Sequence, residues 1–143
     1  MLQFVLIAVV VALGLVGPRW PDSLAGALDV LGAALAVSGG VLAVVSARVL
    51  GPSLTPYPRP GEPGRFVERG PYRIVRHPIY LGGILFLGGF SLAFSPWALA
   101  ATVVLAVVWG LKSSVEERFL RDHYPEYVAY CERTRYRLVP FVY

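Results

Sequence analysis

Three long stretches of this 143-residue chain carry no charged side chain, and they restrict what the chain can fold into. They run from Met1 to Pro18, from Val30 to Ala47, and from His77 to Leu111 if His77 is neutral. A helix that crosses a bilayer needs about 20 mostly apolar residues. Charged residues make up only 15% of the chain, against about 25% in soluble domains. The sequence therefore predicts an integral membrane protein.

The third stretch is too long for one membrane span, and Ser95-Pro96-Trp97 interrupts it. We predict a tight helical hairpin with arms at about Pro78–Phe94 and Trp97–Ser113, although each arm is slightly short for a full crossing. Two further helices are expected within residues 1–47. The predicted fold class is all-α, a single membrane domain of about four transmembrane helices. Residues 48–143 then hold any functional site.

The first stretch has an alternative interpretation as a secretory signal peptide. It lacks a basic segment before the apolar run and a small-residue cleavage site, and Pro18 follows Gly17. We therefore favour a retained transmembrane helix.

The basic residues predict the orientation of the chain. Of 13 Lys and Arg residues, only Arg19 lies between the first two helices; the others lie in residues 48–76 or from Lys112 onward. Four spans put both basic regions on one side, which should be the cytoplasmic side. The net charge of +4 is thus a topology signal and predicts no nucleic-acid partner. Cys131 is the one cysteine, so we expect no disulfide within the chain and no metal site.

Two segments outside the spans have distinctive patterns. Thr55–Pro60 has proline at alternate positions and should be extended, as a stiff connector or as a cap over a membrane-face site. Gly61–Gly64 predicts a turn. After Lys112, charged and apolar residues mix in an amphipathic continuation of the fourth span, which Pro125 ends. A C-terminal amphipathic helix should follow, and its aromatic face carries three tyrosines, at least two of which we expect to anchor it at the headgroup level: Tyr124, Tyr127 and Tyr130.

Candidate functional groups gather at the start of the third span. Pro78 suits the first position of a helix, which puts His77 at the N-cap. A helix N-terminus attracts anions, and Arg76 adds a bidentate donor, although positive-inside flanking also explains an arginine. Tyr80 and Gly82 fall in the first turns, where a glycine admits either a ligand or a neighbouring helix.

An acidic pair is the second candidate. The hairpin returns Glu116 and Glu117, just beyond the fourth span, to the membrane face where the third span begins. They should therefore lie near Arg76 and His77. The simpler alternative is a solvated acidic pair that balances local arginines.

Four motifs together carry a family resemblance: Gly70-Pro71-Tyr72, Arg76-His77-Pro78-x-Tyr80-x-Gly82, Glu116-Glu117-x-x-Leu120 and Tyr127-x-x-Tyr130. On these motifs the chain resembles the isoprenylcysteine carboxyl methyltransferase family and the related phospholipid methyltransferases, over roughly residues 48–141. The proline-rich loop resembles small prokaryotic members.

The resemblance implies an enzyme of the prokaryotic cytoplasmic membrane that uses S-adenosylmethionine at a cytoplasmic site. It implies five cofactor-binding residues: His77, Tyr80, Gly82, Glu116 and Glu117. It also implies that Arg76 and Arg133 face the anionic group of a lipophilic or prenylated acceptor in contact with membrane lipid. The spacing from Arg133 to Pro140 is longer than usual in the family, which leaves Arg135 and Arg137 as alternatives to Arg133.

Two other functions stay open at this stage. One is a membrane reductase of the sterol-reductase type, which has a similar Arg-His-x-x-Tyr segment. The other is a non-catalytic protein that binds anionic lipid through residues 48–76, and it gives Glu116 and Glu117 no role. The acceptor of a methyltransferase also stays open among a prenylated cysteine, a lipid headgroup, a small thiol and a lipophilic metabolite.

Overall fold

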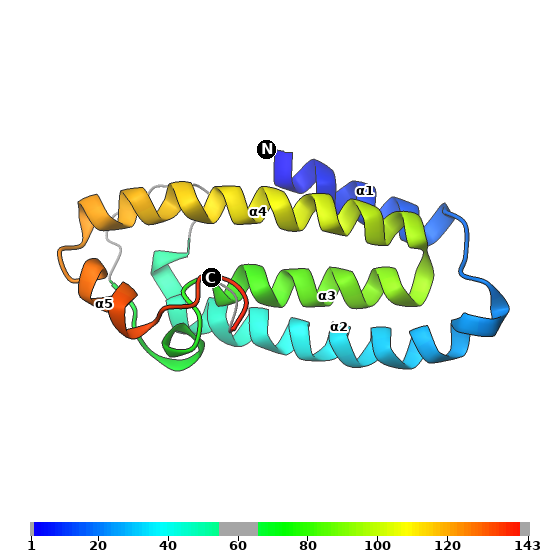
Figure 1. Ribbon diagram of the computed structural model, residues 1–143, viewed down its shortest axis with the longest axis horizontal. Coiled ribbons are helices and arrows are strands. Elements are labelled where there is room, and N and C mark those ends of the chain that lie inside the picture. Colours follow the sequence, from blue (N-terminus) through cyan, green and yellow to red (C-terminus); the bar gives the residue numbers. More distant parts are fainter. Residues whose placement is uncertain (1, 55–65, 141–143) are drawn as a thin grey trace. The chain divides into compact units, whose positions relative to one another are not determined.

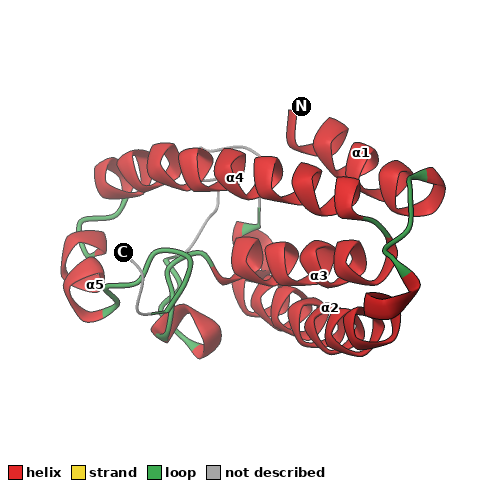
Figure 2. Cartoon of the chain, turned by 45° about the vertical axis from the view of Figure 1, so that its right-hand side comes forward, coloured by secondary structure: helices red, strands yellow, loops and turns green. Residues whose placement is uncertain are grey.

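The computed structural model describes residues 2–54 and 66–140 (Figure 1). In these residues every regular element is a helix, as Figure 2 shows, so the predicted all-α class is confirmed. The α-helices are α1 (Leu2–Val16), α2 (Asp22–Leu50), α3 (Pro78–Phe94), α4 (Pro96–His123) and α5 (Tyr127–Arg133). Short 3₁₀ helices cover Gly51–Ser53 and Gly70–Arg73. The predicted extended segment Thr55–Pro60 and turn Gly61–Gly64 lie outside the described residues.

The predicted hairpin is present, with small differences at its ends. The helix α3 has the predicted bounds, and only Ser95 separates it from α4. A proline opens each helix, because its fixed φ suits the first helical position and its missing N–H would be unpaired there. The helix α4 starts at Pro96 and continues unbroken to His123, so the predicted amphipathic continuation belongs to the same helix.

The chain divides into two compact units. Unit 1 comprises Met1–Val41 and Gly82–Trp109, and unit 2 comprises Leu42–Leu81 and Gly110–Tyr143. The helices α2, α3 and α4 each contribute residues to both units. The single membrane domain expected from the sequence stays a prediction.

Glycines bring α2 and α3 close together in unit 1. A Cβ built on Gly39 would lie only 2.6 Å from the carbonyl oxygen of Gly82. A Cβ on Gly32 would lie 2.9 Å from the backbone nitrogen of Ala93, and Gly89 is equally crowded by the backbone of Ala36. Small residues allow this close approach of backbones, which is common between membrane helices. Of the two roles that a glycine at position 82 could have, the structure shows the helix–helix contact.

Polar side chains also link the helices of unit 1. The hydroxyl groups of Ser91 in α3 and Thr102 in α4 lie 2.8 Å apart, and both residues are buried. The indole N–H of Trp109 in α4 donates to the side-chain oxygen of Gln3 in α1 at 3.3 Å. Such interhelical bonds satisfy polar groups that have no access to water.

Two helical segments in the described residues are long and apolar enough to cross a membrane, Asp22–Ser53 and Pro96–His123. Only 17% and 28% of their most apolar stretches are buried, unlike the core helix of a soluble protein. Val30, Val37 and Val107, for example, are 73%, 68% and 59% exposed. These exposed apolar faces suit contact with lipid. The helices α1 and α3 are apolar but shorter, so the predicted four spans are not confirmed.

Candidate active site

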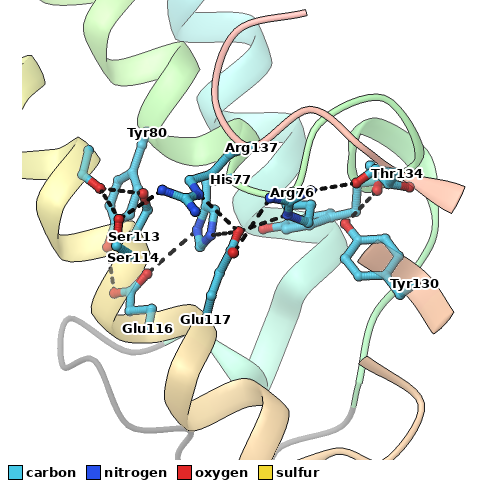
Figure 3. Close-up of polar contacts among 12 residues, drawn as sticks. Arg76, His77, Tyr80, Ser113, Ser114, Glu116, Glu117, Tyr130, Thr134 and Arg137 are labelled. Atoms are coloured by element: carbon cyan, nitrogen blue, oxygen red, sulfur yellow. Dashed lines mark hydrogen bonds and ion pairs between the residues drawn. The ribbon is translucent and has the colours of Figure 1, made fainter. Parts of the chain in front are cut away.

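The centre of the candidate site is a buried ion pair between Arg76 and Glu117 in unit 2 (Figure 3). The Nε of Arg76 donates to Oε1 of Glu117 at 2.7 Å, and each side chain is only 4% exposed. The Nη1 of Arg76 donates to the carbonyl oxygens of Thr134 at 2.8 Å and Arg135 at 2.7 Å. Burial acts to lower the pKa of the Arg76 guanidinium, but the hydrogen bond and charge of Glu117 raise it above its ordinary value. A buried charge needs this full set of partners.

His77 occupies the N-cap of α3, as predicted, because its carbonyl accepts a bond from the N–H of Leu81 at 3.2 Å. Its Nδ1 lies 3.6 Å from Oε2 of Glu116, and its Nε2 lies 3.4 Å from Oε1 of Glu117. The imidazole stacks on the ring of Tyr80, with ring centroids 5.7 Å apart. His77 is 8% exposed, and its Nε2 makes no hydrogen bond within the described part of the chain. The imidazole thus lies between the two carboxylates and against the ring of Tyr80.

Glu116 contacts the same cluster through Tyr80 and Lys112. The Tyr80 hydroxyl donates to Oε1 of Glu116 at 2.6 Å. The Nζ of Lys112, one turn earlier on α4, lies 3.5 Å from the same oxygen and 5.3 Å from the centroid of the Tyr80 ring. The hairpin therefore brings the acidic pair to the start of α3, as predicted from the sequence.

A segment after α5, which we call the C-terminal strap (residues 134–137), binds the start of α3. The N–H groups of Arg76 and His77 donate to the carbonyl oxygens of Tyr136 and Arg137, both at 2.9 Å. These bonds fix the backbone of Arg137 beside the ion pair. Its Nη1 then donates to Oγ of Ser114 at 2.8 Å, and its Nε lies 3.4 Å from Oε1 of Glu117. Figure 3 shows Arg137 beside His77, on the Tyr80 side of the cluster.

Arg133 lies away from this cluster, at the end of α5. It forms two bonds to Glu68, at 2.9 and 2.6 Å, and its side chain is 56% exposed. The Arg133 guanidinium lowers the pKa of the Glu68 carboxyl, and Glu68 raises the pKa of Arg133. The side chain of Arg135 is exposed as well. Of the three arginines left open by the sequence, only Arg137 brings its side chain to the ion pair in the described structure, while Arg135 contributes its carbonyl oxygen.

Two of the three tyrosines expected at the headgroup level are instead buried in the protein. Tyr127 and Tyr130 are each 2% exposed, and both pack against Phe66 with ring centroids 6.0 and 5.3 Å away. The Tyr130 hydroxyl donates to the carbonyl of Tyr72 at 2.6 Å. Burial raises the pKa of Tyr72, Tyr127 and Tyr130, so these tyrosines are neutral supports behind Arg76. The prediction of an interfacial anchor was wrong for Tyr127 and Tyr130, because aromatic packing buries them.

Five of the seven predicted site residues thus meet in unit 2: Arg76, His77, Tyr80, Glu116 and Glu117. Gly82 is a buried helix-contact residue of unit 1, and Arg133 is on the surface of unit 2. No pattern in the sequence indicated a role for Ser114 or Thr134. Their contacts depend on the return path of the strap, which no local pattern signals.

Comparison with known proteins identifies the family. The sequence model for phospholipid methyltransferases matches residues 28–127, and this chain belongs to that family. It is a family of membrane methyltransferases. The match includes the Arg76–Glu117 pair and ends before the C-terminal strap.

One curated relative is the cobalt-zinc-cadmium resistance protein CzcN of Cupriavidus metallidurans. It is 38% identical over 72 residues, which are 48% of this chain and 32% of that protein. The match therefore spans about a third of the relative's length.

Proposed function

We propose that this protein is an S-adenosylmethionine-dependent membrane methyltransferase that methylates the carboxyl oxygen of a lipophilic, isoprenylcysteine-like acceptor. The observation that carries the proposal is the buried cluster around Arg76 and Glu117 in a chain of this family. The cluster joins the Arg76–Tyr80 segment to the Glu116–Glu117 pair, about 40 residues away along the chain. A purely structural helix pair has no need for so many buried polar groups.

The chemistry of these side chains fits the proposed cofactor. S-adenosylmethionine supplies, when bound, a methyl group already activated by a sulfonium. Glu116 and Glu117 offer carboxylates for its ammonium and ribose hydroxyl groups, while His77 and Tyr80 offer stacked rings for a cationic or aromatic part. The Nε2 of His77, buried without a hydrogen bond in the described residues, is a polar atom that a ligand would satisfy. Gly82 stays a predicted contact of the cofactor through the resemblance alone.

The protein's main task in such a reaction is alignment. A carboxylate nucleophile is already ionised at neutral pH and needs no general base. Holding it in line with the methyl group lowers the barrier by removing the entropy cost of the encounter. Arg76 and Arg133 are the arginines that the resemblance predicts for this task. An amine or thiol acceptor would have to lose a proton, and His77 is the nearest group to accept it.

The alternatives have less support. A protein that only binds anionic lipid gives Glu116 and Glu117 no role, yet both contact the cluster through Arg76, His77 and Tyr80. The family match favours methyl transfer over reduction of a sterol-like substrate.

We further propose that the site faces the cytoplasm of a prokaryotic cell. The basic segments on both sides of the cluster support this side of the membrane. A lipophilic or prenylated acceptor would then reach the site from membrane lipid, and the polar cofactor from the cytosol.

Calorimetry on the purified protein in detergent tests the cofactor. We expect binding of S-adenosylmethionine at micromolar to millimolar concentration, weakened by Glu117→Gln and unchanged by Glu132→Gln, a matched change on the exposed face of α5. No binding by the wild-type protein at millimolar cofactor would refute the proposal. Labelled methyl donor and membrane extract would then identify the acceptor.

A further inference from the structure

We propose that Arg137 binds the anionic group of the acceptor, and that Arg76 is a positioning residue that holds Glu117 and the strap. This inference rests on the proposed methyl transfer. The family resemblance predicts an acceptor contact for Arg76 and for Arg133, with Arg135 and Arg137 as alternatives to Arg133. The inference selects Arg137 among these and gives Arg76 a different role.

Four of the five N–H groups of the Arg76 guanidinium have acceptors inside the protein. Its guanidinium makes four hydrogen bonds, two to Glu117 and one each to the carbonyls of Thr134 and Arg135. The side chain is only 4% exposed. An acceptor that took the place of Glu117 on Arg76 would have to break a buried ion pair, which is strongly unfavourable.

Arg137 has the position that an acceptor contact needs. Its side chain is 27% exposed, against 4% for Glu117, so it lies on the open side of the ion pair. Its backbone is anchored by the bond from the His77 N–H, and Leu138 beside it lies close to Gly110 of α4. Ser114 and Glu117 orient the guanidinium. An arginine held in this way pays little entropy when it binds a planar carboxylate with two donors.

The charges of the cluster also favour an anion here. Three cations, Arg76, Arg137 and Lys112, stand against two carboxylates, Glu116 and Glu117. Among these five side chains, positive charges outnumber negative charges by one. The two more exposed cations are Lys112, at 16%, and Arg137. Arg133 adds no unbalanced positive charge, because it forms an ion pair with Glu68 at the surface.

The chemical class of the ligand follows from these groups. A guanidinium fixed beside a helix N-terminus selects a carboxylate over a neutral group of the same shape. The acceptor is therefore a lipophilic molecule that ends in a carboxylate, and its amide should be a poor ligand.

Binding of two probes tests this role directly. The probes are N-acetyl-S-farnesylcysteine, a lipophilic carboxylate, and its neutral carboxamide, measured on the wild-type protein in detergent with S-adenosylhomocysteine present. We expect the wild-type protein to prefer the carboxylate, and Arg137→Gln to weaken carboxylate binding about 10- to 100-fold, as for the loss of a charge-assisted bond. Carboxamide binding and S-adenosylhomocysteine affinity should not change.

Three further variants sharpen the test. Arg137→Lys keeps the positive charge but loses the two parallel N–H donors of the guanidinium, so it should retain part of the preference for the carboxylate probe. This variant also tests the inference if Arg137→Gln does not fold. Arg121→Gln, on an exposed turn of α4, is the matched control. Arg133→Gln separates the two candidate arginines and should affect the preference less than Arg137→Gln.

The possible results separate this inference from the proposed function. A wild-type protein without preference for the carboxylate overturns the inference, as does a preference that survives in Arg137→Gln or that Arg133→Gln alone removes. A loss of S-adenosylhomocysteine affinity in Arg137→Gln also overturns it, since it moves Arg137 to the cofactor. The results on the Arg137 and Arg133 variants leave the proposed methyl transfer in place, whereas a wild-type protein without preference for the carboxylate also counts against the carboxyl acceptor. Use of the cofactor fails separately, if the wild-type protein binds no S-adenosylmethionine.

Discussion

Neutralising Glu117 is the change that most directly probes the buried cluster. Glu117→Gln keeps the shape of the side chain and removes its charge. Arg76 at 2.7 Å and Arg137 at 3.4 Å then face each other without the carboxylate between them. Breaking a buried ion pair in this way costs about 3–5 kcal/mol, of which the remaining amide oxygen recovers about 1 as a hydrogen-bond acceptor. We expect the free energy of unfolding to fall by about 3 kcal/mol, which lowers the melting temperature of a chain of this size by roughly 6–12 °C.

The assay is thermal unfolding in detergent, followed by circular dichroism, with Glu116→Gln as the matched variant. The Glu116 side chain is 14% exposed, and the Tyr80 hydroxyl can donate to an amide oxygen as well as to a carboxylate. Glu116→Gln should therefore lower the free energy of unfolding by only about 1 kcal/mol. A double variant with Arg76→Met completes the cycle and should show coupling between the two positions. Equal losses from the two glutamine variants, or additive effects in the cycle, would show that the ion pair does not hold the site together.

Two further predictions concern the support of the fold. Gly39→Val should destabilise unit 1 by about 1–3 kcal/mol, because its Cβ would collide with the Gly82 carbonyl, whereas Gly26→Val, with open space around it, should be nearly neutral in the same unfolding assay. Tyr130→Phe should cost about 1 kcal/mol through the lost bond to the Tyr72 carbonyl. Burial raises the pKa of Tyr130 in the folded protein, so its hydroxyl ionises first in the unfolded chain, at a pH of about 10. The contribution of neutral Tyr130 to the free energy of unfolding is therefore complete below that pH and falls as the pH rises above it. A pH titration of stability in which Tyr130→Phe falls as steeply as the wild-type protein above pH 10 would contradict this account.

The features that the sequence predicts well are those with a local physical cause. Pro78 and Pro96 open helices because a proline fits the first position, and those positions are visible in the sequence. The separation of charged and uncharged stretches likewise predicts the helices. Once the hairpin is known, the proximity of Glu117 to Arg76 follows, because the start of one arm and the end of the other lie at the same end of an antiparallel pair.

The features that the sequence misses depend on the path of irregular backbone. Arg133, Arg135 and Arg137 look equivalent in the sequence, but α5 ends at Arg133 and the strap then turns back to α3. Carbonyl groups bind Arg76 and His77 there, and every residue type has a carbonyl. Tyr127 is similar, because its burial depends on Phe66, which lies far away in the chain and in no regular element.

The bonds from Arg76 to the carbonyls of Thr134 and Arg135 span 58 and 59 positions of the chain. They also set an order of events during biosynthesis. A ribosome adds Arg76 and the whole of α3 to the chain before it reaches Thr134, so the Arg76 guanidinium is made while two of its acceptors do not yet exist. The candidate site is therefore among the last parts of the described chain to be completed.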